Sequence, residues 1–141
     1  MKYLLDTNII SELISKNPNR EVVNYIQNLN ENKLYLSVIT IGEIKSGIEK
    51  LDNNSKKEKL SHWLHSELLV RFENRIIDLD VDIMLEWGKV NQNLKNIGKC
   101  LPIMDSLIGA ICSSKDFVLL TRNKKDFKNL EINIINPFDE L

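Results

Sequence analysis

The stretch Met1-Lys2-Tyr3-Leu4-Leu5-Asp6-Thr7-Asn8 decides the fold. Residues 3–5 form a short apolar run that ends abruptly at an acidic residue and two small polar ones. Strands buried on both faces have such unbroken runs, as in a parallel sheet covered by helices. Asp6 would then stand at the carboxyl end of a strand, which is where open α/β sheets bind ligands. Taken alone, Asp6 or Asn8 is better explained as the cap of the following helix.

Length and charge bound the possible functions. The 141 residues suit one domain, over residues 1–141, and the apolar fraction of 43% is typical of a globular protein. Nineteen basic and twenty acidic side chains leave a net charge of −1. A whole-molecule attraction to nucleic acid is therefore absent, so a bound polyanion would need a local basic patch or a metal ion.

Targeting and redox features favour a cytoplasmic protein with no membrane partner. No apolar run approaches the roughly 20 residues that span a bilayer. The sequence does not open with a basic region followed by a long apolar core, so secretion is not supported. Cys100 and Cys112 are isolated and lack the short spacing of a metal site, which favours reduced thiols.

The apolar pattern alternates between short strands and amphipathic helices. It predicts strands over residues 3–5, 34–38, 76–77, 117–120 and 132–135. It predicts helices over residues 8–14, 22–29 with Asn19 as cap, 40–51, 56–73, 81–95, from near 105 to 111, and a short turn at 124–127. Thr40 and Glu43 have the spacing of a capping box. The alternation favours an α/β fold, a mainly parallel sheet with helices on both faces.

Four acidic residues occupy comparable places in this pattern: Asp6, Glu43, Asp105 and Asp126 each follow a strand or open a helix. If the strands are parallel, the three acids that follow strands, Asp6, Glu43 and Asp126, converge on one edge of the sheet. Asp105 opens an otherwise apolar helix instead. Clustered carboxylates repel one another unless a cation neutralises them, and oxygen ligands suit Mg²⁺ or Mn²⁺. Such ions commonly bridge to phosphates, which matches phosphodiester hydrolysis. Singly, each acid is also explained by the helix dipole or by capping.

Four motifs lie in order along nearly the whole chain: Asp6-Thr7-Asn8, Ser37-x-x-Thr40-x-x-Glu43, Leu101-Pro102-x-x-Asp105-x-x-Ile108, and Thr121-Arg122-Asn123-x-x-Asp126-Phe127, the last followed by Asn136-Pro137. In this arrangement the chain resembles a PIN-domain ribonuclease of the VapC/FitB type, the toxin of bacterial type II toxin–antitoxin systems. The resemblance implies a three-layer α/β/α sandwich with a mainly parallel central sheet. It also implies a Mg²⁺ site, with Mn²⁺ as a substitute, at the carboxyl edge of that sheet.

The resemblance assigns roles to individual residues. Asp6 and Asp105 become metal ligands, Glu43 a third acid on the metal, and Thr7, Asn8 and Thr40 hydrogen-bonding neighbours of the substrate site. Many relatives carry a fourth acid two residues after the threonine of the last motif, where this chain has Asn123. Two alternatives stay open there, because either Asn123 or Asp126 would complete the catalytic set. Arg122 would contact RNA phosphates, with support from the nearby lysines Lys45, Lys124, Lys125 and Lys128.

The resemblance also implies a reaction and partners. Metal-activated water would hydrolyse an RNA phosphodiester bond. A cognate antitoxin would occlude the acidic edge, and the chain would form a homodimer. The amphipathic pattern of the helix over 56–73, and not the resemblance, makes that helix the candidate clamp for such a peptide. One alternative is another metal-dependent phosphohydrolase of the haloacid-dehalogenase type, which needs an Asp where this chain has Asn8. The other alternative is a non-catalytic Mg²⁺-binding regulatory module.

Overall fold

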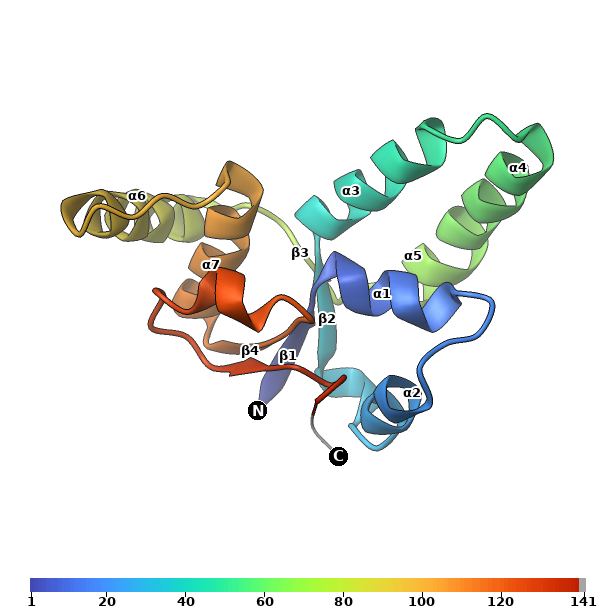
Figure 1. Cartoon of the computed structure of the whole chain (residues 1–141), viewed down its shortest axis with the longest axis horizontal. Helices are drawn as coiled ribbons and strands as arrows, with labels where there is room; N and C mark the ends of the chain where they lie inside the picture. The colour runs from blue at the N-terminus through green and yellow to red at the C-terminus, as the bar shows by residue number, and fades with distance from the viewer. Residues whose placement is uncertain (140–141) are drawn as a thin grey trace.

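The computed structural model describes residues 1–139 and contains a five-stranded sheet in the order β3-β2-β1-β4-β5 (Figure 1). All four neighbouring pairs run parallel. The bounds are β1 (Lys2–Leu5), β2 (Leu34–Ser37), β3 (Ile76–Ile77), β4 (Phe117–Leu120) and β5 (Ile134–Ile135). The predicted parallel sheet is therefore confirmed, and the stretch that opens the chain is its central strand.

Helices cover both faces of this sheet. The α-helices are α1 (Thr7–Ile14), α2 (Arg20–Gln27), α3 (Val38–Glu49), α4 (Asn54–Trp63), α5 (Leu69–Arg71), α6 (Val81–Asn96) and α7 (Ile103–Lys115). Shorter turns are η1 (Glu31–Lys33), the π-helical η2 (Leu64–Leu68) and η3 (Lys124–Phe127). Within residues 1–139, no helix is long and apolar enough to cross a membrane.

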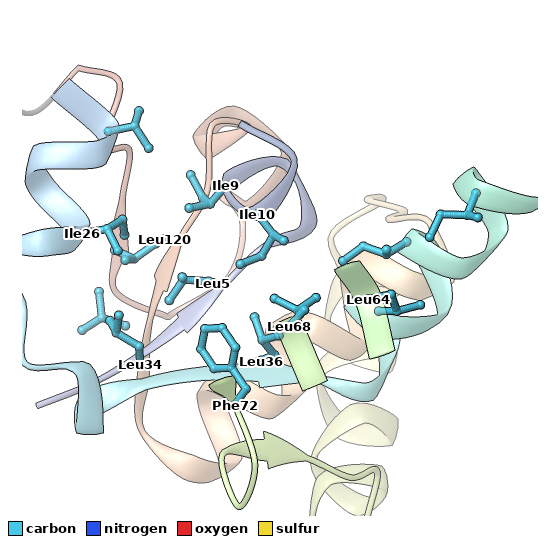
Figure 2. Close-up of a cluster of buried hydrophobic side chains, with 14 residues drawn as sticks. Leu5, Ile9, Ile10, Ile26, Leu34, Leu36, Leu64, Leu68, Phe72 and Leu120 are labelled. Atoms are coloured by element: carbon cyan, nitrogen blue, oxygen red, sulfur yellow. The ribbon is translucent and has the colours of Figure 1, made fainter. Parts of the chain in front are cut away.

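Successive residues of β1 enter two separate cores. Leu5 belongs to a cluster with α1, α2, α3 and η2, which Figure 2 shows around Phe72. Leu4 belongs to a second cluster, which is built mainly from α7 and β4, with Ile83 of α6 packed into it. Because neighbouring side chains of a strand point to opposite faces, this division makes the molecule a three-layer sandwich. Leu4 and Leu5 are 1% and 0% exposed, so β1 is fixed from both sides.

The second strand ends earlier than its sequence pattern indicates. We predicted a strand over residues 34–38 and a helix from Thr40, but α3 already begins at Val38. Ser37 caps this helix, since its Oγ accepts a hydrogen bond from the backbone N–H of Thr40 at 3.3 Å. The predicted capping box of Thr40 and Glu43 is therefore wrong, and the Glu43 carboxylate is not used as a cap.

The helix predicted over residues 56–73 has two unexpected features. It begins at Asn54, where the Asn53 side chain caps it, and it passes through the π-helical turn η2 before α5 ends. Elsewhere the bounds differ only at the ends: α7 starts at Ile103, and β5 retains two of the four predicted residues. Gly98 has φ +71 just after α6, as expected of a helix-ending glycine.

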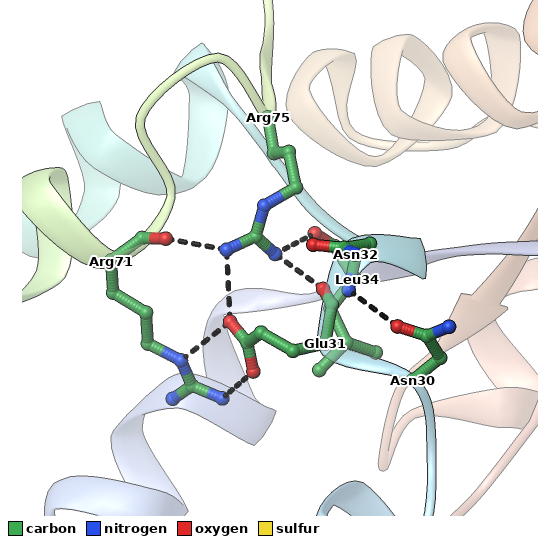
Figure 3. A network of polar contacts seen from close by, with 6 residues as sticks. All are labelled: Asn30, Glu31, Asn32, Leu34, Arg71 and Arg75. Carbon is green, nitrogen blue, oxygen red and sulfur yellow. Dashed lines mark hydrogen bonds and ion pairs between the residues drawn. The ribbon is translucent and has the colours of Figure 1, made fainter.

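An arginine–glutamate network fastens the end of the α4–α5 segment to the start of β2 (Figure 3). The carboxylate of Glu31 accepts hydrogen bonds from Arg71 at 2.9 and 3.0 Å and from Arg75 Nη2 at 2.9 Å. Arg75 Nη1 also donates to the backbone oxygens of Glu31 and Leu34, at 2.6 and 2.7 Å. The network therefore ties α5 and the residue before β3 to η1 and the start of β2.

Candidate active site

Asp6 stands at the carboxyl end of the central strand and is only 7% exposed. Its backbone N–H continues the sheet by donating to Leu120 O at 2.9 Å. Its Oδ1 caps α1 by accepting from the backbone N–H of Thr7 at 2.8 Å, and its Oδ2 accepts from Thr121 Oγ1 at 2.8 Å. Burial raises the pKa of Asp6 despite these two hydrogen bonds. The helix-cap explanation is therefore correct, but it uses only one of the two oxygens.

Thr121 is the polar centre behind Asp6. It is fully buried, and besides donating to Asp6 its Oγ1 accepts from Asn8 Nδ2 at 3.2 Å and from the backbone N–H of Asn123 at 3.1 Å. Asn8 Nδ2 also lies 3.4 Å from Asp6 Oδ2. Sequence reasoning gave Thr121 no role beyond its place in a motif. The signal that could have found it is its position next to Asp6 across the paired ends of β1 and β4.

Glu43 reaches the site from the first part of α3. Thr7 Oγ1 donates to Glu43 Oε1 at 2.6 Å and lies 3.2 Å from Thr40 Oγ1, so one hydroxyl links α1 to α3. Thr40 is buried beneath this contact at 1% exposure, whereas Glu43 is exposed. Thr7 and Thr40 thus hold an acid in place, which is the hydrogen-bonding support predicted for them.

Asp105 approaches from the first turn of α7, on the other side of the sheet edge. Burial raises its pKa, and the charges of Asp6, Asp126 and Glu43 raise it further. The α7 turn has no side-chain cap. It is held instead by Ser106, whose Oγ donates to Ile103 O at 2.8 Å and accepts from Trp87 Nε1 at 2.9 Å.

The side chains converge on one open pocket of about 500 Å³. Nearly all of the predicted site residues line it: Asp6, Thr7, Asn8, Glu43, Asp105, Arg122 and Asn123. Two predicted residues, the buried Thr40 and Asp126, do not line the pocket. The charge of Asp126 nevertheless raises the pKa of both Asp6 and Asp105. Ser11 and Glu12 line it without having been predicted. Glu12 is already engaged, since its carboxylate accepts from the backbone N–H of Asn19 at 2.8 Å.

The lysines expected around the site differ in their availability. Lys45 Nζ forms an ion pair with Glu49 at 2.9 Å, which competes with a phosphate contact. Lys124, Lys125 and Lys128 are exposed beside η3. A cationic rim is therefore present on the side of the last motif.

The pocket offers oxygen ligands to a divalent cation. The charge of Glu43 makes ionisation of Asp6 and of Asp105 more costly, and a bound cation would relieve this repulsion. In the described part of the chain no three acidic, histidine or cysteine side chains form a closed metal-binding group. Mg²⁺ does not need one, because it keeps several waters and commonly binds through one or two carboxylates. The donor set therefore fits a hard cation that retains water.

A parallel sheet between two helical layers, with an acidic pocket at its carboxyl edge, defines a class of α/β proteins that bind ligands or metal ions at that edge. Residues 3–133 match the PIN domain family. The chain belongs to the PIN-domain family, whose ribonucleases generally use a divalent metal ion.

Named relatives cover the chain from end to end. Toxin FitB of Neisseria gonorrhoeae is 31% identical over 137 residues, which are 97% of this chain and 99% of FitB. VapC ribonuclease Y4jK of Sinorhizobium fredii is 29% identical over 96% of this chain and 97% of its own length. The crystal structure of FitAcB from Neisseria gonorrhoeae superposes with a TM-score of 0.93 at 30% identity, covering 98% of this chain and 99% of that chain.

Proposed function

We propose that the protein is a metal-dependent endoribonuclease that acts as the toxin of a type II toxin–antitoxin module in the cytoplasm, with residues 1–141 as one PIN domain. The observation that carries the proposal is the convergence of Asp6, Glu43 and Asp105 on one pocket. Relatives named as a toxin and as a ribonuclease support it. Asn8 argues against a haloacid-dehalogenase-type phosphatase, because its side chain is occupied in bonding Thr121 and Arg122.

The residues have distinct roles in this reaction. Asp6 and Asp105 would bind Mg²⁺, or Mn²⁺ in its place, directly, with Glu43 as the third acid beside it. The ion would lower the pKa of water and neutralise phosphoryl charge. Thr121 and the Thr7 N–H orient Asp6, while the Thr7 hydroxyl orients Glu43. Glu43 is the most exposed of the three acids. We assign to it the role of general base, which accepts the proton that the attacking water releases.

Asn123 occupies the place of the fourth acid and lines the pocket. Its amide would hold a water molecule or a phosphate oxygen without adding negative charge. Asp126 would act at longer range, since its charge reaches Asp6 and Asp105 although its side chain does not line the pocket. Of the two alternatives, the structure thus favours Asn123 as the contacting residue and Asp126 as an electrostatic neighbour.

The decisive test is cleavage of single-stranded and structured RNA with Mg²⁺ and with EDTA. We expect Asp6→Asn and Asp105→Asn to lose more than about 100-fold in rate, since even indirect contacts to a metal are worth 10–100-fold. Asp52→Asn, an exposed acid in the loop before α4, is the matched control and should cleave normally. Cleavage that persists in EDTA or in both site variants would reject the nuclease. Mn²⁺ binding without cleavage would favour the non-catalytic module.

The toxin assignment also requires partners. We propose a homodimer and a cognate antitoxin whose segment covers the acidic edge. We place the predicted clamp at a groove of mixed polarity between α1 and the α4–α5 segment. Its lining residues are Ile10, Leu13, Ile14, Trp63, Glu67, Leu68 and Arg71. Expression should arrest growth, and the product of a small neighbouring gene should relieve the arrest. Protease protection mapping of that complex should protect the α4–α5 segment, and sedimentation should give the mass of a dimer.

A further inference from the structure

Arg122 is held at the rim of the acidic pocket by contacts to its backbone from two other segments. Its backbone N–H donates to Asn8 Oδ1 at 3.0 Å, and its carbonyl oxygen accepts from Asn136 Nδ2 at 3.4 Å. Asn8 belongs to α1, and Asn136 follows the last strand β5. The backbone position of Arg122 is therefore fixed by α1 on one side and by the segment after β5 on the other.

The guanidinium of Arg122 is stacked as well. Its Cζ lies 4.4 Å from the centroid of the Phe138 ring. Phe138 is half-buried and packs against the main core. Its backbone N–H donates to Asn136 Oδ1 at 3.0 Å, and Asn136, itself 8% exposed, also donates to Asp139 at 2.9 Å. The ring is thus anchored by a turn that the same asparagine closes.

Stacking leaves the edge of a guanidinium free. A guanidinium that lies parallel over an aromatic face keeps its N–H donors in its own plane and directs them along the ring, not into it. Within residues 1–139 the Arg122 side chain makes no ion pair or hydrogen bond, although it lines the same pocket as four acids. Its donors are therefore oriented and unused, and fixing the side chain in advance removes entropy that binding would otherwise cost.

We propose that Phe138 is a positioning residue that presents the Arg122 guanidinium to a backbone phosphate of RNA beside the cleavage position. The inference rests on the proposed ribonuclease function and deepens it. The net charge of −1 and the acids of the pocket repel RNA, so a fixed cation at the rim has to offset this repulsion. Planar guanidinium recognises phosphate through paired N–H donors, which the flexible lysines beside η3 do not provide.

The test is a double-mutant cycle between Arg122 and Phe138 in RNA binding. A fluorescent single-stranded RNA is titrated in EDTA, where cleavage is stopped, and KM and kcat are measured separately with Mg²⁺. Phe138→Leu, which keeps an apolar anchor, should weaken binding about 3- to 10-fold and raise KM with kcat nearly unchanged. Phe138→Tyr should restore both values. Adding Phe138→Leu to Arg122→Ala should cause no further loss.

Distinct outcomes overturn the two proposals separately. The positioning role would be overturned if Phe138→Leu weakened RNA binding equally in the wild type and in Arg122→Ala. Failure of Phe138→Tyr to restore binding would overturn it as well. A fall in kcat alone would overturn it too. Thermal denaturation of each variant separates these results from unfolding. If Arg122 and Phe138 are coupled in RNA binding but no metal-dependent cleavage is found, the proposed nuclease is rejected and the positioning role is kept. If the protein does not bind RNA, both proposals are rejected.

Discussion

Asp6 combines a structural and a chemical task because its two oxygens have different partners. Oδ1 serves the first turn of α1, and Oδ2 receives the buried hydroxyl of Thr121. Burial raises the pKa of Asp6, whereas the Thr121 hydrogen bond lowers it and so favours the charged form. Thr121 therefore keeps a buried carboxylate in the state that a cation needs.

Replacing Thr121 with valine tests this dependence. Thr121→Val keeps the shape but removes the hydroxyl, so Mn²⁺ should bind about 10- to 100-fold more weakly. Loss of the hydrogen bond also raises the pKa of Asp6 further, so binding should need a higher pH than in the wild type. Electron paramagnetic resonance of free Mn²⁺ measures both effects. Thr121→Ser retains a hydroxyl and should bind nearly normally, and an equal loss in both variants would contradict the argument.

At the scale of elements, Glu31 connects η1 to α5 and to the start of β3. Burial alone would raise the pKa of Glu31, but hydrogen bonds and charges from Arg71 and Arg75 outweigh burial and lower it. A carboxyl group with a lowered pKa stabilises the fold above its ordinary value of 4.5, and this contribution is lost as pH falls through the lowered pKa. Glu31 thus stabilises the fold at neutral pH and ceases to do so in acid.

The corresponding variant is Glu31→Gln. It should lower the free energy of unfolding at pH 7 by about 1 kcal/mol, a modest value because the carboxylate is half-exposed and solvent screens it. The difference from the wild type should shrink as pH falls below 4.5 and through the lowered pKa, because the wild-type carboxylate then becomes protonated. Urea denaturation at several pH values measures this difference in the free energy of unfolding. Glu58→Gln, which changes an exposed glutamate on α4, should show no such pattern.

Elements were easier to predict from the sequence than the contacts between them. Apolar runs and periodicity located the central strand, β4 and α6, because burial imposes those patterns directly. Ser37 was missed as a cap because Thr40 and Glu43 fit a capping box equally well in sequence. The placement of Asp6 and Glu43 followed from strand ends once the strands were taken as parallel. Asp105 follows α6 and not a strand, so only the motif resemblance placed it at the site. The Thr121–Asp6 contact joins residues 115 apart in the chain, so only the folded sheet reveals it.

At the scale of the whole molecule, the acidic pocket makes the metal-free protein less stable than it would otherwise be. Both Asp6 and Asp105 have raised pKa values, so ionising them opposes folding. A group with a raised pKa contributes its stability below its ordinary value of 3.8 and loses it as pH rises through the raised pKa. At neutral pH a bound cation would therefore offset this cost.

Thermal denaturation of the wild type and Asp105→Asn measures this dependence. In EDTA at pH 7 the variant should melt above the wild type, because one repelling charge has been removed. Lowering the pH toward 3.8 should close that gap, since the wild-type carboxylate is then protonated as well. Mg²⁺ at ten times its dissociation constant should stabilise the wild type by about 1.4 kcal/mol, or about 3 to 6 °C. The variant should gain much less. An equal Mg²⁺ response in both proteins would mean that Asp105 is not part of the cation site.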